Sequence, residues 1–447
     1  MASYNQKTIA GSLLLALALV CGTANAAVNV QCPGDNDGDA AWNTLGGNPA
    51  KRDVPPGTGG TPDNVVCKHL TAGDSFVTMS DGNPMYTFGF DDQTGTPPKQ
   101  VIGRGILNAE WPGPRIALDQ GDEFYLSLTN VGTVIRPDLF DPHTVHFHGF
   151  PNAASVFDGV PEVSVSINMG ATLSYYYNIV EPGTYIYHCH VEATEHMEMG
   201  MLANLWVRPA QNRLADGTLL GNHVHSNPDN PSGTATRLQD SPLVGDKYVY
   251  NDGDGTTLYD VEQALQLSGF DSDFHDASLF VQPLPFAFLE SDYPMINGRG
   301  YPETVMGFKP PPVDDADGKV TGVPGEQLTT DPTQTMDSAV TVQSGQKLLL
   351  RLSNVSIDRF YTLTAQGLTM KIVGTGAKQM RGTEGLNIYT ETASVNFGGG
   401  ETHDVIIDTQ GVAPGTYFVY AAEAHQLSNK TQMDGGLMTE IVVTAAP

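Results

Sequence analysis

Short apolar runs separated by turn residues make up most of the chain from Ser75 onward. The runs are rich in Val, Ile, Thr, Tyr and Phe, and Gly, Asn, Asp and Pro separate them. This pattern is typical of many short strands in a β-sandwich or barrel. No long segment keeps a helical period, although short pieces such as 261–267 do. The pattern therefore predicts an all-β fold.

An internal repeat divides this strand-rich part into two copies. The stretch QGDEFYLSLTNVG, which begins at Gln120, is echoed by SGQKLLLRLSNVS, which begins at Ser344. Later, EPGTYIYHCH from Glu181 is echoed by APGTYFVYAA from Ala413. Two tandem copies of one β-sandwich explain both pairs.

The repeat and the local composition together predict the domain boundaries. We expect a first domain over 73–210 and a second over 246–447. Residues 211–245 are polar and rich in Gly, Asn, Pro and Ser, which predicts a linker. Residues 27–72 hold little apolar content and are predicted to form a loop-rich extension.

The first 26 residues have the pattern of a signal peptide. Lys7 precedes an apolar run, 9–20, and the tripeptide at 24–26 offers a small-residue cleavage site. The run is too short to span a bilayer, and no later run approaches 18 uninterrupted apolar residues. We therefore expect an exported protein, periplasmic or extracellular, with no membrane span.

Charge excludes one class of partner. The chain has 50 Asp and Glu against 22 Lys and Arg, a formal net charge of −28. Nucleic acids and anionic membrane surfaces repel such a chain, so we expect neither as a partner. The excess is typical of a solvated acidic surface.

The cysteines suggest one disulfide and one free thiol. Beyond the signal peptide the chain has Cys32, Cys67 and Cys189, and disulfides persist in an oxidising compartment. Cys32 and Cys67 flank a Gly-, Pro- and Asp-rich stretch that packs poorly and gains most from a covalent link. We pair these two, which leaves Cys189 as a free thiol within a histidine cluster.

Six of the twelve histidines lie between His143 and His196. Alternate residues of a strand share a face, so His188 and His190 point one way and Cys189 points the other. A thiolate with two imidazoles and a thioether suits a copper ion that cycles between oxidation states. The order and spacing predict such a quartet: His143, Cys189, His196 and Met201.

These residues amount to a family resemblance. HTVHFHG and HCHVEATEHMEMGM, together with AEWPGPRI, DGVPEVSVSI and MINGRGYP, resemble the motifs of multicopper oxidases. The resemblance implies two tandem cupredoxin-like Greek-key β-sandwich domains, with copper as the cofactor. It implies a type 1 copper on the quartet, which accepts electrons from a small-molecule or metal-ion donor. It also implies a second copper site that reduces oxygen, on His146, His148, His188 and His190. Asp158, in FDGVPE, is a candidate proton donor for that catalysis.

The second copy departs from the family pattern. A trinuclear copper cluster in this family needs eight histidines, and only four are present at matching positions. The second copy has Tyr361, Thr364 and Gln366 where the first has histidines, and 420–422 read Tyr-Ala-Ala. In two-domain relatives a neighbouring subunit of a trimer supplies the missing ligands, so a homotrimer is expected. Metal binding stays open for four further histidines: His223, His225, His403 and His425.

Alternative functions remain compatible with the sequence. One is a blue-copper electron carrier, and another is a copper-binding protein without oxidase activity. A copper nitrite reductase is disfavoured, because that family has a carboxylate at the position of His146 and a non-ligand residue at that of His190. The leading interpretation is an oxidase that couples one-electron oxidation of a donor to oxygen reduction.

Overall fold

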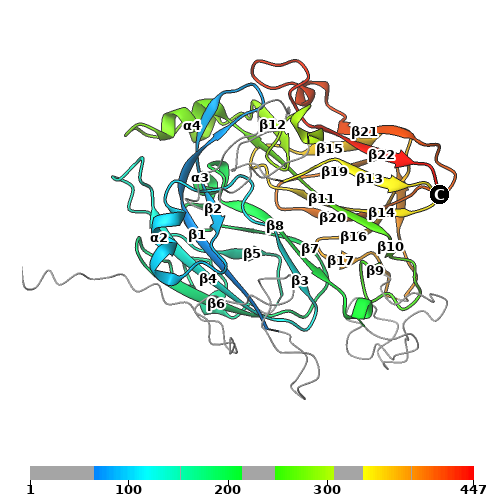
Figure 1. Ribbon diagram of the computed structural model, residues 1–447, viewed down its shortest axis with the longest axis horizontal. Coiled ribbons are helices and arrows are strands. Elements are labelled where there is room, and N and C mark those ends of the chain that lie inside the picture. Colours follow the sequence, from blue (N-terminus) through cyan, green and yellow to red (C-terminus); the bar gives the residue numbers. More distant parts are fainter. Residues whose placement is uncertain (1–64, 152, 214–246, 307–335, 384, 447) are drawn as a thin grey trace, which may run out of the picture.

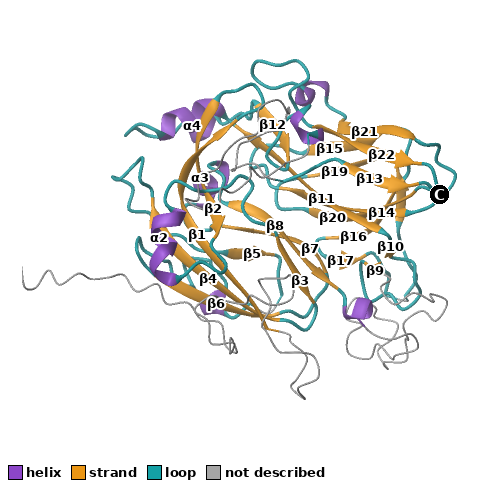
Figure 2. Ribbon diagram, viewed as in Figure 1, coloured by secondary structure: helices purple, strands orange, loops and turns teal. Residues whose placement is uncertain are grey.

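A computed structural model describes residues 65–151, 153–213, 247–306, 336–383 and 385–446. The predicted signal peptide, most of the predicted extension, nearly all of the predicted linker, and Cys32, His223 and His225 lie outside these residues. The described chain is built mainly from strands, which form two neighbouring β-sandwiches (Figures 1 and 2). The predicted all-β class is confirmed.

The first sandwich consists of two four-stranded sheets. One sheet has the order β2 (Pro84–Asp92), β1 (Val65–Thr78), β4 (Glu123–Gly132) and β6 (Thr172–Asn178). The other has the order β3 (Ile116–Asp119), β8 (Leu202–Arg208), β7 (Gly183–His188) and β5 (His146–His148). β1 runs parallel to β4 and β3 to β8, so the chain between the strands of each pair crosses over rather than turning back as a hairpin. Short helices fill the connections: α2 (Pro98–Gly105), η1 (Ser155–Phe157), α3 (Ala193–Glu198) and η2 (Ala210–Arg213).

The second sandwich repeats this plan with longer sheets. Its larger sheet has the order β12 (Tyr293–Ile296), β11 (Val261–Phe270), β14 (Lys347–Asn354), β20 (Thr402–Asp408), β16 (Met370–Thr375) and β17 (Lys378–Gln379), with β18 (Thr390–Thr392) on β16. The smaller sheet has the order β13 (Val340–Gln343), β22 (Met438–Thr444), β21 (Gly415–Ala421), β15 (Tyr361–Ala365) and β19 (Ser394–Phe397). A ribbon and four short helices complete it: β9 (Lys247–Tyr248), β10 (Leu258–Tyr259), α4 (Ser272–Ser278), η4 (Phe286–Phe288), η5 (Glu303–Val305) and η6 (Ala424–Leu427).

Each sandwich encloses its own apolar core, and the two pack against each other. Outer strands such as β13 and β22 alternate buried and more exposed residues, as expected for strands with one face on a core. Every residue of β7 is buried, because one face covers the first core and the other packs on β14 and β20 of the second sandwich. A third apolar cluster joins the two sandwiches, with Trp111 and Ile186 on one side and Phe270 and Met295 on the other.

Two local predictions differ from the structure. Residues 261–267, which have a short helical period, form part of strand β11, because pairing with β12 and β14 overrides that weak pattern. β1 begins at Val65, upstream of the position 73 at which we expected the first domain to start, because its first residues pair in parallel with β4. No helix among the described residues is long and apolar enough to cross a membrane.

Candidate metal centres

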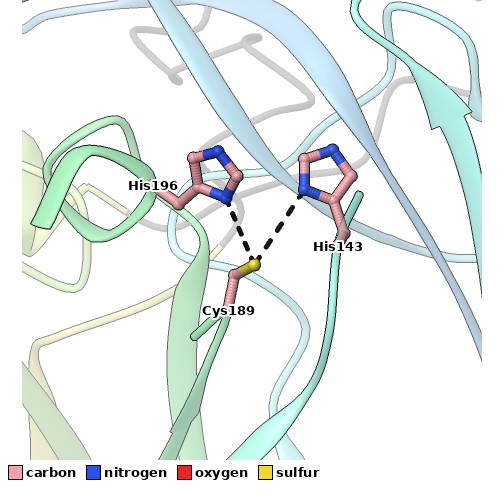
Figure 3. A group of neighbouring side chains, drawn as sticks. All are labelled: His143, Cys189 and His196. Carbon is pink, nitrogen blue, oxygen red and sulfur yellow. Dashed lines mark hydrogen bonds between the residues drawn. The ribbon is translucent and has the colours of Figure 1, made fainter. Parts of the chain in front are cut away.

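The first candidate centre lies at one end of the first sandwich, where β7 ends. Cys189 follows β7, His196 lies in α3, and His143 pairs with Ile167 in an isolated bridge before β5. Cys189 Sγ lies 3.2 Å from His196 Nδ1 and 3.9 Å from His143 Nδ1 (Figure 3). All three side chains are fully buried, and one ligand atom of each lies within 4.8 Å of the others.

Met201 belongs to the same corner of the sandwich. Its backbone N–H donates to the His196 carbonyl at 2.8 Å, and its own carbonyl accepts from the Cys189 N–H at 3.0 Å. Its side chain is fully buried in the same apolar cluster as Cys189. The structure therefore brings His143, Cys189 and His196 together and holds the backbone of Met201 beside them, while the thioether as a fourth ligand stays a prediction.

The electrostatics of this centre favour a thiolate. Burial raises the pKa of Cys189, but the charges and hydrogen bonds of His196 and His143 outweigh it and hold that pKa well below its usual value. Burial acts in the opposite direction on His196 and lowers its pKa, but the Cys189 thiolate and the Asp141 carboxylate outweigh this effect and raise that pKa to about 10. The backbone N–H of Thr144 also points at Cys189 Sγ, at 3.5 Å. A buried thiolate with two imidazole nitrogens facing it is a donor set that fits copper.

The second candidate centre contains the four histidines of β5 and β7. His146 lies directly opposite His188 across the two strands, and the ring of His146 is 5.2 Å from the rings of both His188 and His190. His148 Nδ1 lies 3.4 Å from His188 Nε2. Ligand atoms of His146, His148 and His188 lie within 4.8 Å of one another. Three of the four predicted imidazoles thus converge, and the ring of His190 lies beside that of His146; their binding of copper at one site stays a prediction.

Hydrogen bonds to carbonyls fix the orientation of two of these rings. His146 Nδ1 donates to the Asp158 carbonyl at 2.7 Å, and His188 Nδ1 donates to the Cys189 carbonyl at 2.8 Å. In each neutral ring Nε2 is then a free electron-pair donor, which is the state that binds a metal. Burial lowers the pKa of His146 and His148, and that of His188 to about 3, so the rings are neutral near pH 7.

Asp158 lies behind His146. Its carboxylate is 3.7 Å from His146 Nδ1, on the side of the ring that its own backbone carbonyl contacts. The structure thus shows a positioning contact through the carbonyl, with the carboxylate beside the same ring nitrogen. Its role as a proton donor stays a prediction.

A cavity of about 590 Å³ opens in front of the four histidines. Its far wall comes from the second sandwich, from the loops 356–360 and 398–401, and includes Asp358, Arg359 and Glu401. No histidine of the described second sandwich lines it. Gly400 approaches so closely that a Cβ atom there would lie 3.1 Å from His148 Nε2. Sequence reasoning missed this wall, and its one visible signal is the glycine triplet 398–400, which permits close backbone approach.

The two described histidines left open by the sequence lie apart from both centres. His403 lies on β20 with its ring 5.3 Å from that of Phe397, and its Nδ1 has no hydrogen-bond partner. His425 lies in η6. Neither joins a group of possible metal ligands in the described part of the chain. Cys189 is the free cysteine among the described residues, while the pairing of Cys67 with Cys32 stays a prediction.

Fold and centres together define a protein of tandem cupredoxin-type sandwiches with a buried cluster of one thiol and two imidazoles that could hold a metal ion. Two multicopper oxidase family models match residues 89–212 and 222–446. The chain therefore belongs to the multicopper oxidase family, as its motifs predicted, and copper is the cofactor that this family implies.

Individual relatives are more distant. The laccase abr2 of Aspergillus fumigatus is 27% identical over 51% of this chain and 34% of its own length. The multicopper oxidase MmcO of Mycobacterium tuberculosis is 36% identical over 18% of this chain and 14% of its own length. The chain thus spans about a third or less of these curated relatives.

Solved structures support the fold. A blue copper oxidase from Nitrosomonas europaea superposes with a TM-score of 0.55 and 21% identity, covering 84% of this chain and 85% of that one. A copper nitrite reductase from the same organism gives a TM-score of 0.50 and 16% identity, covering 85% and 94%. At such identities the likeness shows the fold alone, and it confirms the predicted cupredoxin-like sandwiches.

Proposed function

We propose that this protein is a copper-dependent oxidase that couples one-electron oxidation of a donor to the reduction of oxygen. The observation that carries the proposal is the adjacency of two donor sets. Cys189 belongs to the first centre, and its chain neighbours His188 and His190 belong to the second. Copper bound at such sites supplies one-electron redox chemistry, and four electrons with four protons reduce one O2 to two waters.

Each residue has a defined part in this proposal. His143, Cys189, His196 and Met201 would hold the type 1 copper, and the four histidines of β5 and β7 would hold the additional copper. The Cys189 carbonyl accepts a hydrogen bond from His188 Nδ1 at 2.8 Å, so a covalent and a hydrogen-bonded connection link the two centres. Asp158 would deliver protons beside His146.

Burial gives the two centres different access. His143, Cys189 and His196 are closed off from solvent, which keeps water and oxygen away from the thiolate. The four histidines instead face the 590 Å³ cavity, which is large enough to admit O2 and water. This difference supports electron transfer at the first centre and oxygen chemistry at the second.

A blue-copper electron carrier is the second candidate function. The observation that favours it is the far wall of the cavity, where the described second sandwich presents Asp358, Arg359 and Glu401 in place of histidines. Four imidazoles are half of the ligands of a trinuclear cluster, so the additional site could hold fewer coppers than three.

Copper content and oxygen uptake separate the two functions. The experiment measures copper per subunit and oxygen consumption with a generic one-electron donor, for the native protein and for the double variant His146→Ala/His190→Ala. The oxidase proposal expects a blue double variant with less copper and no oxygen uptake. A native protein that is blue, fully loaded with copper and inert to oxygen would establish the carrier.

Export, the disulfide, the domain boundaries and the oligomer belong to the same proposal. The signal-peptide pattern at 1–26 supports export to the periplasm or beyond, and export supports a disulfide between Cys32 and Cys67. The internal repeat supports a first domain that ends near 210 and a second over 246–447, and strand β1 moves the start of the first domain from 73 to Val65. The family resemblance supports a homotrimer, although this chain's own second sandwich already forms the far wall of the four-histidine cavity. Light scattering that shows a monomer over a wide concentration range would exclude the trimer.

A further inference from the structure

The loop that carries His196 and Met201 is held by a nearly complete set of hydrogen bonds within the first sandwich. Three carbonyls at the end of α3, of residues 195–197, accept from the backbone N–H groups of residues 199–201. The Met199 carbonyl accepts from the Phe88 N–H at 2.8 Å, and the Met201 carbonyl from the Cys189 N–H. The last carbonyls of a helix need such partners when they are buried.

The carbonyl of Glu198 is the exception, because its partner comes from the second sandwich. His275, on α4, places Nε2 3.0 Å from that carbonyl and Nδ1 2.5 Å from the carbonyl of Tyr86 on β2. A neutral ring donates to one of these carbonyls and a protonated ring to both. In either state the fully buried ring lies between β2 and the copper loop.

Further contacts surround the Glu198 carbonyl, from residues just before α4 and from the loop itself. The Asp271 N–H, at the start of α4, donates to the buried carboxylate of Glu198 at 2.7 Å. The ring of Phe270 lies 4.4 Å from His275 and 4.3 Å from Trp111. Gly200 closes the loop at φ +116°, where a Cβ atom would lie 2.6 Å from the Phe88 carbonyl. The loop therefore has little room to shift without moving α4.

We propose that His275 is a positioning residue for the type 1 copper site, through which the second sandwich fixes the loop that carries His196 and Met201. The inference rests on the proposed copper site of the first sandwich. It assigns a part in metal binding to a domain that supplies none of the proposed ligands. His275 touches neither the metal ligands nor a substrate, and it acts through the Glu198 carbonyl, two residues after His196.

The test compares copper binding in two variants of the full chain. His275→Phe keeps a ring against Phe270 and removes the ring N–H, whereas His275→Gln keeps an amide N–H donor. We expect His275→Phe to weaken copper binding at the Cys189 site measurably, but by less than the roughly 10- to 100-fold that loss of a hydrogen-bond partner of a ligand itself costs, because His275 acts one step further from the metal. The copper–thiolate absorption should also shift or broaden. His275→Gln should recover part of the affinity and of the native spectrum.

His403→Phe is the matched control, since it makes the same change on the second sandwich away from the loop. It should leave copper affinity and absorption as in the native protein. If His275→Phe lowers only the thermal stability and keeps native affinity and absorption, His275 is merely structural and the proposal fails. If His275→Phe does not fold, His275→Gln alone must still weaken copper binding measurably.

Amide hydrogen exchange of the copper-free protein separates this inference from the proposed function. The N–H groups of Met199 and Met201 should exchange faster in His275→Phe than in the native protein and in His403→Phe. A native protein that binds no copper at Cys189 would remove the proposed function, yet faster exchange would still establish that His275 holds the loop. Unchanged exchange would overturn the positioning role.

Discussion

The two sandwiches share one strand register but differ in what that register presents. In the first, His146 lies opposite His188 across β5 and β7. In the second, Thr364 lies opposite Tyr420 across β15 and β21, at the same place in the repeat. The same backbone therefore forms with and without the imidazoles, so the fold does not depend on the copper ligands.

The comparison also shows that the proposed copper ligands lower the folding stability of the first sandwich while no metal is bound. Ala421 occupies the position in the second copy that Cys189 occupies in the first, and it is buried in the second apolar core. Tyr361 occupies the position equivalent to His143, and its hydroxyl donates to the Ser268 carbonyl at 3.1 Å. In the first sandwich, the Cys189 thiolate is fully buried, with Nδ1 of His143 and of His196 facing it. A bound metal offsets such costs, so copper should stabilise the first sandwich selectively.

The largest expected effect comes from exchanging the residue types of Cys189 and Ala421, which occupy equivalent positions in the two sandwiches. Cys189→Ala should abolish the copper–thiolate absorption completely while the protein stays folded, because alanine already fills the equivalent place in the second sandwich. Visible absorption of the copper-loaded variant and its far-ultraviolet circular dichroism measure the two effects. The reciprocal change, Ala421→Cys, should create no blue colour, since Tyr361 supplies no imidazole. Blue colour in Cys189→Ala would disprove the type 1 assignment.

A second pair of variants compares the facing strands. His146→Ala should remove copper from the four-histidine centre and leave the blue absorption intact, because His146 is at the middle of that group. Thr364→Ala, its equivalent in the second sandwich, should leave copper content unchanged. Metal analysis of both purified variants provides the measurement. Equal copper loss in the two variants would mean that the second sandwich also binds the metal.

Much of the fold could be predicted because its signals are local. Strand-forming runs, turn residues and the repeat predict two all-β copies, and strand alternation places His188 and His190 opposite in direction to Cys189. The error at 261–267 arose because a short period says little once neighbouring strands pair with the segment. Tertiary pairing decides such cases.

The candidate centres were predictable only on the side that holds their ligands. His143 and Cys189 are recognisable by residue type and spacing. The far wall of the cavity, with Arg359 and Glu401, and the contact of His275 with the copper loop depend on how the sandwiches pack. No spacing along the chain encodes a contact between residues 198 and 275, so only the structure reveals it.

A third difference between the sandwiches should appear as acid sensitivity. His69 pairs with Ser127 on β1 and β4, and the equivalent pair in the second sandwich is Ala264 with Arg351. Burial lowers the pKa of His69 from 6.5 to about 4, although Asp92 opposes the shift. Between these values the unfolded chain binds a proton that the folded protein excludes, so stability falls as pH falls.

The loss should approach about 3 kcal/mol at pH 4, at about 1.4 kcal/mol for each unit of pKa. Denaturant unfolding of the copper-free protein at pH 6.5 and pH 4 measures it. His69→Gln has no titrating ring and can still donate to the hydroxyl of Thr129, which His69 Nε2 contacts at 2.8 Å. This variant should lose less stability than the native protein over the same range. An equal loss in both would show that His69 does not contribute.

The smallest expected effect tests the contact between the sandwiches at the four-histidine centre. Gly400 has φ +84°, and a Cβ atom there would lie 3.1 Å from His148 Nε2, whereas Gly411 has φ +77° and nothing within 4 Å. Alanine at either position carries the strain of a left-handed backbone, roughly 1–2 kcal/mol of unfolding free energy. Gly400→Ala should in addition displace the His148 ring and weaken copper binding at the four histidines, while Gly411→Ala should leave copper binding unchanged. Denaturant unfolding and copper titration of the two variants give the comparison. Native copper affinity in Gly400→Ala would mean that the second sandwich closes the cavity without constraining the ring of His148.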